Sequence, residues 1–501
     1  MPSRRKLLKY AGAIAATRFL DVRMGASAEI PDAVANPFAL GVASGEPTIA
    51  GFTIWTRLVA GGLGLFPVNA IQVRWEVAED DGFRQIVCSG EAHAGINRAH
   101  SVHVDINGLK PACTYFYRFH AAGKVSRVGR AMTLPAAADS FRLALTACQH
   151  WEHGYFHAYR DMCAQKPQII LQVGDYIYEK SFGAGPDVRS FPSENPHSLN
   201  EYRARHALYK TDPDLQNAHA FCPWLVSPDD HEVENDYAGS TGAATSDPAA
   251  FLARRTAAYQ AYIEHMPLSQ ARIQSLVRPR FHRRLKIGDL AELVLLDTRQ
   301  FRSRQPCMPG SAASSGFVME DCSERHSEGR SMLGAQQDAW LRRHLEQPTS
   351  AWTVIAQQTL FAPINVGSNG DIKYWSDIWD GYPDCREQIL SACERAGRDN
   401  LLVLGGDVHS FWLNELEQSG RRIGTEIVTS CLASRNAPTE LFEHAQAENQ
   451  HVRYLDNTKA GYVLVELNRS HASIDFRAVS DLTAKDVSVT SVHKHVVRKA
   501  V

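Results

Sequence analysis

The 501-residue sequence has no long hydrophobic run after its N-terminal segment and no surplus of charge of either sign. A transmembrane helix needs about 20 consecutive apolar residues, so we expect no membrane span. The 53 Lys and Arg nearly balance the 55 Asp and Glu, so the charge predicts no specific nucleic-acid site. The composition, 44% apolar and 22% charged, is that of a globular protein whose length allows two or more domains.

Cysteine is also scarce, and the sequence contains no internal repeat. Ten cysteines in 501 residues are too few for a disulfide scaffold, and none has zinc-finger spacing. Cys307 and Cys322 bracket a Gly- and Ser-rich loop, so in an oxidising compartment we expect a disulfide there. Cys385 and Cys393 share a predicted helix, where we expect no bridge.

The N-terminus has the features of an export signal. Arg4 and Arg5 precede a short, weakly apolar run rich in Ala, and residues 26–28 fit a small-residue cleavage pattern. We therefore predict a twin-arginine signal peptide over residues 1–28, recognised by the twin-arginine export machinery, and a periplasmic or secreted protein. A basic, disordered tail is the alternative.

Two regions with different hydrophobic patterns follow this signal. Short alternating runs over residues 36–135, separated by Gly, Pro and Asp turns, predict a small N-terminal β-sandwich. From Phe141, apolar runs alternate with helical patterns, which predicts a layered α/β domain over residues 141–490. Its expected strands are 141–147, 167–173, 224–227, 290–296, 352–357, 401–404, 461–467 and 473–479, and its expected helices lie near 155–165, 248–265, 335–347 and 384–396. Residues 183–200 are predicted to form a long loop, and we expect this loop to lie over the active site.

Candidate ligands recur where the predicted strands end. After the strand at 401–404, two glycines precede Asp407 and His409, whose side chains point the same way in extended backbone. In α/β sheets, ligands bind at the carboxyl ends of the strands. Earlier strands end near Cys148 and Asp175 and in the acidic segment 229–236. A shared metal site is one interpretation, and polar turns after core strands are the other.

The residue types indicate which metal each side chain would bind. Asp175 can bridge two cations, and a Tyr178 phenolate suits ferric iron, unless Tyr178 is a core aromatic. Cys148 is either a thiolate ligand or a small buried hydrophobe. The side-chain carbonyl of Asn235 suits calcium.

The segment Asp229–Glu232 places three carboxylates and an imidazole side by side. So many adjacent carboxylates repel one another, which is unfavourable unless cations or water offset the repulsion. The alternative to a cation site is a solvated acidic loop. His231 is the best candidate for an acid that protonates a leaving oxygen, or for a group that stabilises an oxyanion. For Asp297 and Arg299, a structural ion pair that closes a strand is an equally good interpretation, and Asp297 is left out of the site.

A further segment, Trp375–Pro383, precedes the helix that carries Arg386. Its aromatic residues, Tyr382 among them, are candidate pocket walls, and Arg386 is a candidate partner for phosphate. A packed loop anchored by aromatics is an equally good interpretation.

Together these segments resemble the PhoD family of alkaline phosphatases and phosphodiesterases. The resemblance covers nearly the whole chain after the signal, and the motifs in this order are very specific. The matching segments are GVASG (41–45), ACQ (147–149), GDYIYE (174–179), DDHE (229–232), AYIEHMP (261–267), LDTRQ (296–300), WDGY (379–382) and GGDVHS (405–410). The resemblance implies a four-layer αββα, calcineurin-like metallophosphoesterase domain after an N-terminal β-sandwich, and a ferric ion (Fe³⁺) with calcium (Ca²⁺) partners.

By the same resemblance, the iron ligands fall at five positions and the calcium ligands at three. Asp175 belongs to both sets and would bridge the metals. His150 stands where the family often has Asn, so it is a candidate phosphate contact; Glu46 replaces a more usual Asp. The implied iron ligands are Cys148, Asp175, Tyr178, Asp407 and His409, and the implied calcium ligands are Asp175, Asp230 and Asn235.

We therefore expect metal-assisted hydrolysis of small-molecule phosphate monoesters or diesters, with Asp175 and His231 as the catalytic residues. One alternative is a phosphodiesterase or phospholipase D-like enzyme that acts on phospholipids or wall polymers. Another is an exported binding or adhesion protein with a structural metal site, although structural sites are normally coordinatively closed.

Overall fold

The structure is a computed structural model that describes residues 36–183, 187–245, 247–309, 314–347 and 350–499. The predicted signal peptide, residues 1–28, lies outside the described residues. Among those residues, no helix combines the length and the hydropathy that crossing a membrane requires.

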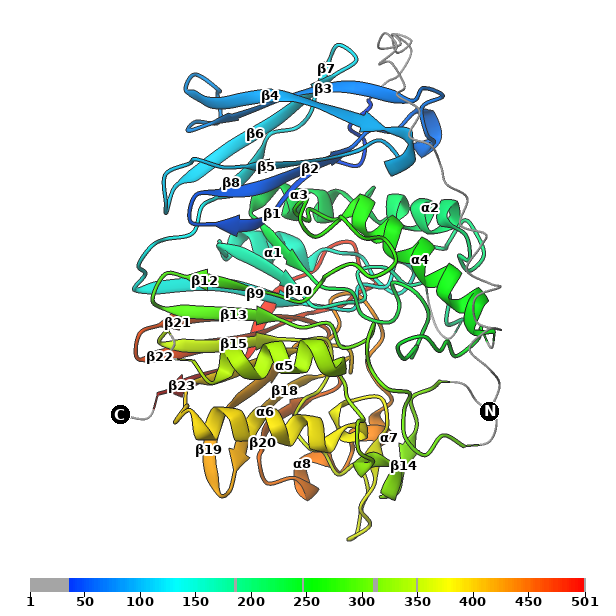
Figure 1. The fold of residues 1–501 in the computed structure, drawn as a ribbon, viewed down its shortest axis with the longest axis vertical. Coiled ribbons are helices and arrows are strands. Elements are labelled where there is room, and N and C mark those ends of the chain that lie inside the picture. Colours follow the sequence, from blue (N-terminus) through cyan, green and yellow to red (C-terminus); the bar gives the residue numbers. More distant parts are fainter. Residues whose placement is uncertain (1–35, 184–186, 246, 310–313, 348–349, 500–501) are drawn as a thin grey trace, which may run out of the picture.

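Two large mixed sheets lie face to face in the body of the molecule (Figure 1). One has nine strands: β23 (Val489–Arg498), β22 (His471–Val479), β21 (Gly461–Asn468), β9 (Ser140–Thr146), β10 (Ile169–Gln172), β11 (Trp224–Val226), β1 (Val42–Thr48), β2 (Gly51–Arg57) and β5 (Ser101–Ile106). The other has seven: β12 (Arg283–Ile287), β13 (Ala291–Leu295), β15 (Trp352–Ala356), β17 (Leu401–Gly405), β19 (Arg421–Val428), β18 (Phe411–Gln418) and β20 (Val452–Asp456). A short ribbon pairs β14 (Val318–Met319) with β16 (Tyr374–Trp375).

The main core lies between the two sheets. Leu143 and Leu145 of β9 pack there with Leu293 of β13 and Leu402 of β17, whereas Ala144 of β9 faces the opposite side. Both faces of these central strands are therefore buried, which explains why they read as continuous apolar runs rather than alternating ones.

Helices cover the outer face of each sheet (Figure 1). Those on the nine-stranded sheet are α1 (Ala158–Ala164), α2 (Leu199–Tyr209), α3 (Pro213–Phe221) and α4 (Pro248–His265), and those on the seven-stranded sheet are α5 (Gly334–Leu345) and α6 (Pro383–Arg395). Two short helices, α7 (Thr439–Phe442) and α8 (Ala445–Glu448), precede β20. The predicted αββα arrangement is confirmed.

The N-terminal strands form two packed sheets, as the prediction of a β-sandwich requires. Strands β1, β2 and β5 pack on β3 (Ala70–Ala78), β4 (Ile86–Gly95), β6 (Thr114–Ala121), β7 (Lys124–Val125) and β8 (Gly129–Met132). The sandwich is not separate from the rest, however, because β1 pairs in parallel with β11 through Gly45 and Trp224. A Cβ atom on Gly45 would lie 2.3 Å from the carbonyl oxygen of Pro267, so this close junction requires glycine.

Cys307 and Cys322 form a disulfide, as expected, with their Cα atoms 6.7 Å apart. Cys385 and Cys393 are buried, free thiols on α6. The disulfide closes a loop that begins shortly after β13 and returns before α5, on the side of the molecule where the strand ends gather.

Candidate active site

Six buried strands deliver polar residues to one region between the two sheets. Strands β9, β10 and β11 run parallel in one sheet, and β13, β15 and β17 run parallel in the other. Polar residues follow the carboxyl end of each strand: Cys148 after β9, Asp175 after β10, Asp229, Asp230 and His231 after β11, Arg299 after β13, Thr359 after β15, and Asp407 and His409 after β17.

The backbone at these strand ends is strained. Cys148, Asp175, Asp407 and His409 all adopt positive φ, between 50° and 67°, a region that few residues other than glycine favour. Gly174 has φ +122°, and a Cβ atom there would lie 2.3 Å from the Cβ of Asp229. Four of the predicted ligands thus occupy conformations that cost free energy, which is typical of functional sites.

One group of donors mixes sulfur, oxygen and nitrogen. The thiol of Cys148 lies 3.4 Å from Oδ2 of Asp175, and the Tyr178 hydroxyl donates to the same oxygen at 3.0 Å. The Tyr178 hydroxyl also lies 2.9 Å from Nε2 of His409, whose Nδ1 donates to the Arg435 carbonyl at 2.6 Å. This second bond fixes the His409 tautomer and leaves Nε2 available as a ligand.

A second group consists mainly of carboxylates. Ligand atoms of Asp175, Asp230 and His231 lie within 4.8 Å of one another, as do those of Asp175, Asp229, Asp230 and Asp407. Asp175 also belongs to the mixed group with Cys148 and His409, so it joins all three. Asp407 lies with the carboxylates rather than with the thiol.

These donors fit a cation. Oδ1 of Asp175 and Oδ1 of Asp230 are buried without a hydrogen-bond partner, although buried carboxylates are normally satisfied. Burial and the neighbouring Asp175 carboxylate raise the pKa of both Cys148 and Tyr178, and burial likewise raises the pKa of Asp175. A bound cation would favour the ionised form of all three, so the candidate metal site is chemically consistent.

His231 is held by a carboxylate outside the metal cluster. Its Nδ1 lies 2.6 Å from Oε2 of Glu179, and Nδ1 donates that hydrogen bond. Burial opposes protonation, but the charges of Glu179, Asp175 and Asp230 outweigh it and raise the pKa of His231 well above its usual value. His231 lines the cavity described below and is therefore placed to hold a proton there.

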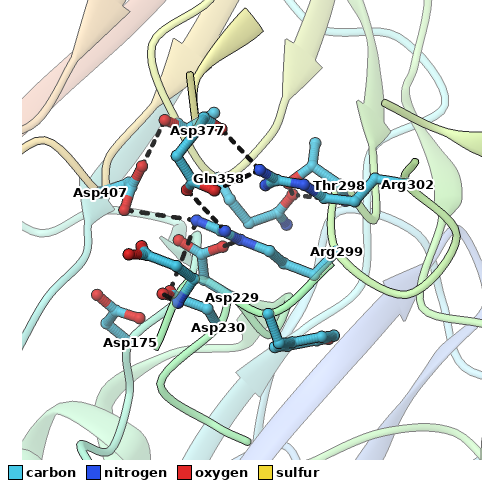
Figure 2. A network of polar contacts seen from close by, with 12 residues as sticks. Asp175, Asp229, Asp230, Thr298, Arg299, Arg302, Gln358, Asp377 and Asp407 are labelled. Atoms are coloured by element: carbon cyan, nitrogen blue, oxygen red, sulfur yellow. Dashed lines mark hydrogen bonds and ion pairs between the residues drawn. The ribbon is translucent and has the colours of Figure 1, made fainter. Parts of the chain in front are cut away.

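Arg299 lies among the carboxylates, in contrast to the predicted ion pair with Asp297 (Figure 2). Asp297 instead accepts hydrogen bonds from Gln300 and from the Arg299 backbone. The Arg299 side chain is only 1% exposed, and its four carboxylate contacts are Asp229 at 2.5 Å, Asp377 at 2.7 Å, Asp230 at 3.6 Å and Asp407 at 3.7 Å. The prediction left Arg299 out of the site, and the structure corrects it.

The sequence-based prediction of the site did not include three more residues of this region. Asp377 is paired with Arg299 and Arg302, Thr359 donates to Asp407, and Glu179 holds His231. Asp377 lies in the segment Trp375–Pro383, which the sequence suggests as a pocket wall because of its aromatic residues. Thr359 carried no signal, since a single Thr after a strand is common.

Three predicted substrate contacts point elsewhere. Arg386 pairs with the buried Asp380 at 2.7 Å, and the Tyr382 hydroxyl donates to the Ser303 carbonyl at 2.6 Å. His150 donates through Nε2 to the Lys180 carbonyl and accepts from the Glu152 amide through Nδ1. These contacts tie the three side chains to the protein itself, and none of them is among the described residues that line the cavity below. Their predicted roles, a phosphate contact for Arg386 and His150 and a pocket wall for Tyr382, stay predictions.

The ring of His150 instead packs against the ring of Tyr178. Its ring lies 4.6 Å from that of Tyr178 and stacks on His153 at 3.7 Å. Burial, with a contribution from His153, lowers the pKa of His150 to about 2. A neutral ring packed in this way stabilises the Tyr178 side chain without adding charge to the site.

A cavity of about 300 Å³ opens at these strand ends. Asn235 and His231 line it beside the carboxylates, and Trp375 forms part of its wall, as one interpretation of that segment predicted. Phe182, immediately before the predicted loop 183–200, also lines it. Beyond Gly183, the described part of the loop is tied to the body of the protein by Arg189, which donates to the carbonyls of Trp151 and Gly154.

Two stacked sheets flanked by helices, with acidic and imidazole donors at the strand ends, define a metallophosphoesterase-like architecture. The profile of the PhoD-like phosphatase family matches residues 143–476, and that of its N-terminal domain matches residues 25–135. The chain therefore belongs to the PhoD-like phosphatase family.

Two relatives match nearly the whole chain. It is 36% identical over 518 residues to alkaline phosphatase D of Bacillus subtilis (strain 168), and the match covers 99% of this chain and 88% of the relative. A solved structure of PhoD, also 36% identical, superposes with a TM-score of 0.88 and covers 92% of this chain and 90% of its own.

Proposed function

We propose that this PhoD-like phosphatase hydrolyses phosphate monoesters, diesters or both with the help of bound metal ions. The observation that carries the proposal is Asp175, which joins three donor groups beside a cavity that His231 also lines. A site that serves only structure is normally closed by its ligands, whereas this one faces an open cavity.

The donor types support ferric iron with calcium. Thiolate, phenolate and imidazole donors from Cys148, Tyr178 and His409 suit a transition metal, and carboxylate and amide oxygens from Asp230 and Asn235 suit calcium. Asp175 would be shared between them. Bound cations would hold the phosphoryl oxygens and make the attacking water more acidic at neutral pH.

The protein's own residues supply the rest of the step. Water forms a bond to phosphorus while the ester P–O bond breaks, and the departing alcohol oxygen takes a proton from His231. Because Glu179 occupies Nδ1 of His231, Nε2 is the atom that delivers the proton. Glu179 thereby keeps His231 both oriented and protonated.

The purified protein should contain iron and calcium and hydrolyse p-nitrophenyl phosphate or its bis ester, with activity lost on chelation and restored by the two metals. A ferric–phenolate pair should also give a broad visible absorption band that Tyr178→Phe weakens. A colourless protein that contains only zinc would rule out the iron assignment but not the hydrolysis.

The ratio of monoester to diester turnover separates the phosphatase from the phosphodiesterase or phospholipase D-like alternative. Assays on phospholipid extend the comparison, since the same site would serve both reactions. The binding or adhesion alternative requires a protein that is metal-loaded and inert toward every phosphate ester tested.

We also propose export by the twin-arginine route to the periplasm or beyond. The paired arginines, the Ala-rich run and a metal centre best loaded before export support this proposal. Replacing Arg4 and Arg5 by Lys should leave the full-length precursor in the cytoplasm on cell fractionation. Export of that variant at the normal level would contradict the proposal.

A further inference from the structure

Half of the residues that line the active-site cavity are apolar. Val408 separates Asp407 from His409, and Phe182 stands 42% exposed with its ring 5.6 Å from that of His231. The apolar lining comes from four separate segments: Phe182, Trp375 and Ile378, Val408, and Ala437, Pro438, Leu441 and Phe442. The last segment follows directly on Asn436, whose side chain donates to the carbonyl of His409.

These side chains are not simply the edge of a core. Trp375, Val408, Ala437 and Leu441 are only partly buried, and they pack with one face on the apolar cluster beside the seven-stranded sheet. Their other face is turned to the cavity that they line. Leaving such surface in water is unfavourable by about 25 cal/mol per Å², so a ligand group that covers it gains that free energy.

The polar lining is a poorer match for other kinds of ligand. Among the described residues that line the cavity, none is Lys, Arg, Ser or Thr, and the polar ones are five Asp, two His and Asn235. Arg299 lies behind the carboxylates and is 1% exposed. His231, which the proposed mechanism already engages with the leaving oxygen, is the only positively charged side chain among the described residues that line the cavity. A second phosphate would therefore find no further protein cation, and Asp236 would add repulsion. The hydroxyls of a sugar or polyol could donate to the carboxylates, but they would find few donors and would leave the apolar half of the lining uncovered.

We propose that the apolar wall binds the alcohol part of the substrate, and that this alcohol is an uncharged alkyl or aryl group. The inference rests on the proposed function, because the metal-binding side of the same cavity is taken as the phosphoryl site. Hydrolysis breaks the ester P–O bond with the alcohol lying against Phe182, Trp375 and Leu441. The cavity, at about 300 Å³, is at the small end of the range for ligand sites and accepts a short chain or a single ring beside the phosphoryl group.

The test measures how ligand affinity depends on chain length. Methyl-, butyl- and hexylphosphonate keep the phosphoryl group and cannot be hydrolysed, so calorimetry on the metal-loaded protein measures binding independently of turnover. Full burial of one methylene is worth about fourfold in affinity; for this open cavity we expect at least about twofold per methylene. We also expect 2,3-dihydroxypropylphosphonate to bind more weakly than propylphosphonate.

Leu441→Asn makes the wall polar while keeping the branching and the number of side-chain heavy atoms, and it should flatten the chain-length dependence. Leu441→Met should keep that dependence. Leu252→Asn is the matched control, because Leu252 lies on α4, is 37% exposed and does not line the cavity. This control should keep the wild-type affinities throughout.

The outcomes distinguish a failure of the apolar subsite from a failure of the proposed hydrolysis. Affinity that is independent of chain length, or tighter binding of the dihydroxypropyl ligand, overturns the apolar subsite even if esters are hydrolysed. If no ester is hydrolysed, the proposed function fails, and the phosphonate series still decides whether the wall binds an apolar group.

Discussion

Asp175→Asn should lower kcat/KM for p-nitrophenyl phosphate and for its bis ester by more than about a hundredfold. Loss of a residue that merely supports a metal ligand costs 10–100-fold in affinity or activity, and Asp175 is itself the carboxylate common to all three donor groups. Asn keeps the shape and still accepts the hydrogen bond from Tyr178, so the variant removes charge with little change of packing. Metal analysis of the same preparation should show the loss of at least one cation.

Asp289→Asn is a suitable control for this substitution. Asp289 is a surface carboxylate, 54% exposed, that pairs with Arg469 far from the strand ends. Its replacement should leave both metal content and turnover unchanged. Wild-type turnover by Asp175→Asn would refute the assignment of Asp175 and, with it, the shared-metal account of the site.

The positions of the strand ends can be predicted because they depend on the pattern of neighbouring residues in the sequence. Buried central strands leave continuous apolar runs, and the polar residue after each run must emerge at the carboxyl edge of a parallel sheet. Asp175 and His409 could therefore be assigned to one region from the sequence, although they lie 234 positions apart in the chain.

The parts that could not be predicted depend on tertiary pairing. The segment LDTRQ gives no indication of whether Arg299 turns toward Asp297 or toward Asp229, because that choice is set by charges on other loops. Arg386 is a candidate for phosphate from the sequence because nothing there shows that Asp380, six positions earlier, pairs with it in the folded protein. Helix α2 was missed because its buried face includes Arg203, Arg205 and His206, which leave no apolar periodicity to detect.

The second large effect concerns Arg299. In the metal-free protein, its guanidinium is the arginine charge nearest to Asp229 and Asp230, and it shares Asp377 with Arg302. These three carboxylates are each at most 2% exposed. Removing one partner of a buried ion pair costs about 3–5 kcal/mol because the other charge is left uncompensated. Arg299→Gln should therefore lower the free energy of unfolding of the metal-free protein by about that amount.

Metal ions should recover part of this loss. Cations bound to Asp230 and Asp407 would neutralise two of the carboxylates that Arg299 contacts, so the variant should lose less stability when it is metal-loaded. Equivalently, the stabilisation gained on adding metal should be larger in Arg299→Gln than in the wild type. Urea denaturation of chelator-treated and metal-loaded protein measures both differences.

Arg386→Gln is the matched control, because Arg386 is also a buried arginine, but it pairs with a single carboxylate, Asp380, outside the cavity. Its replacement should destabilise the metal-free and metal-loaded forms equally. If Arg299→Gln does the same, Arg299 is an ordinary structural ion pair. An excess loss confined to the metal-free form would instead identify Arg299 as the internal cation that keeps the carboxylate cluster assembled before metal binds.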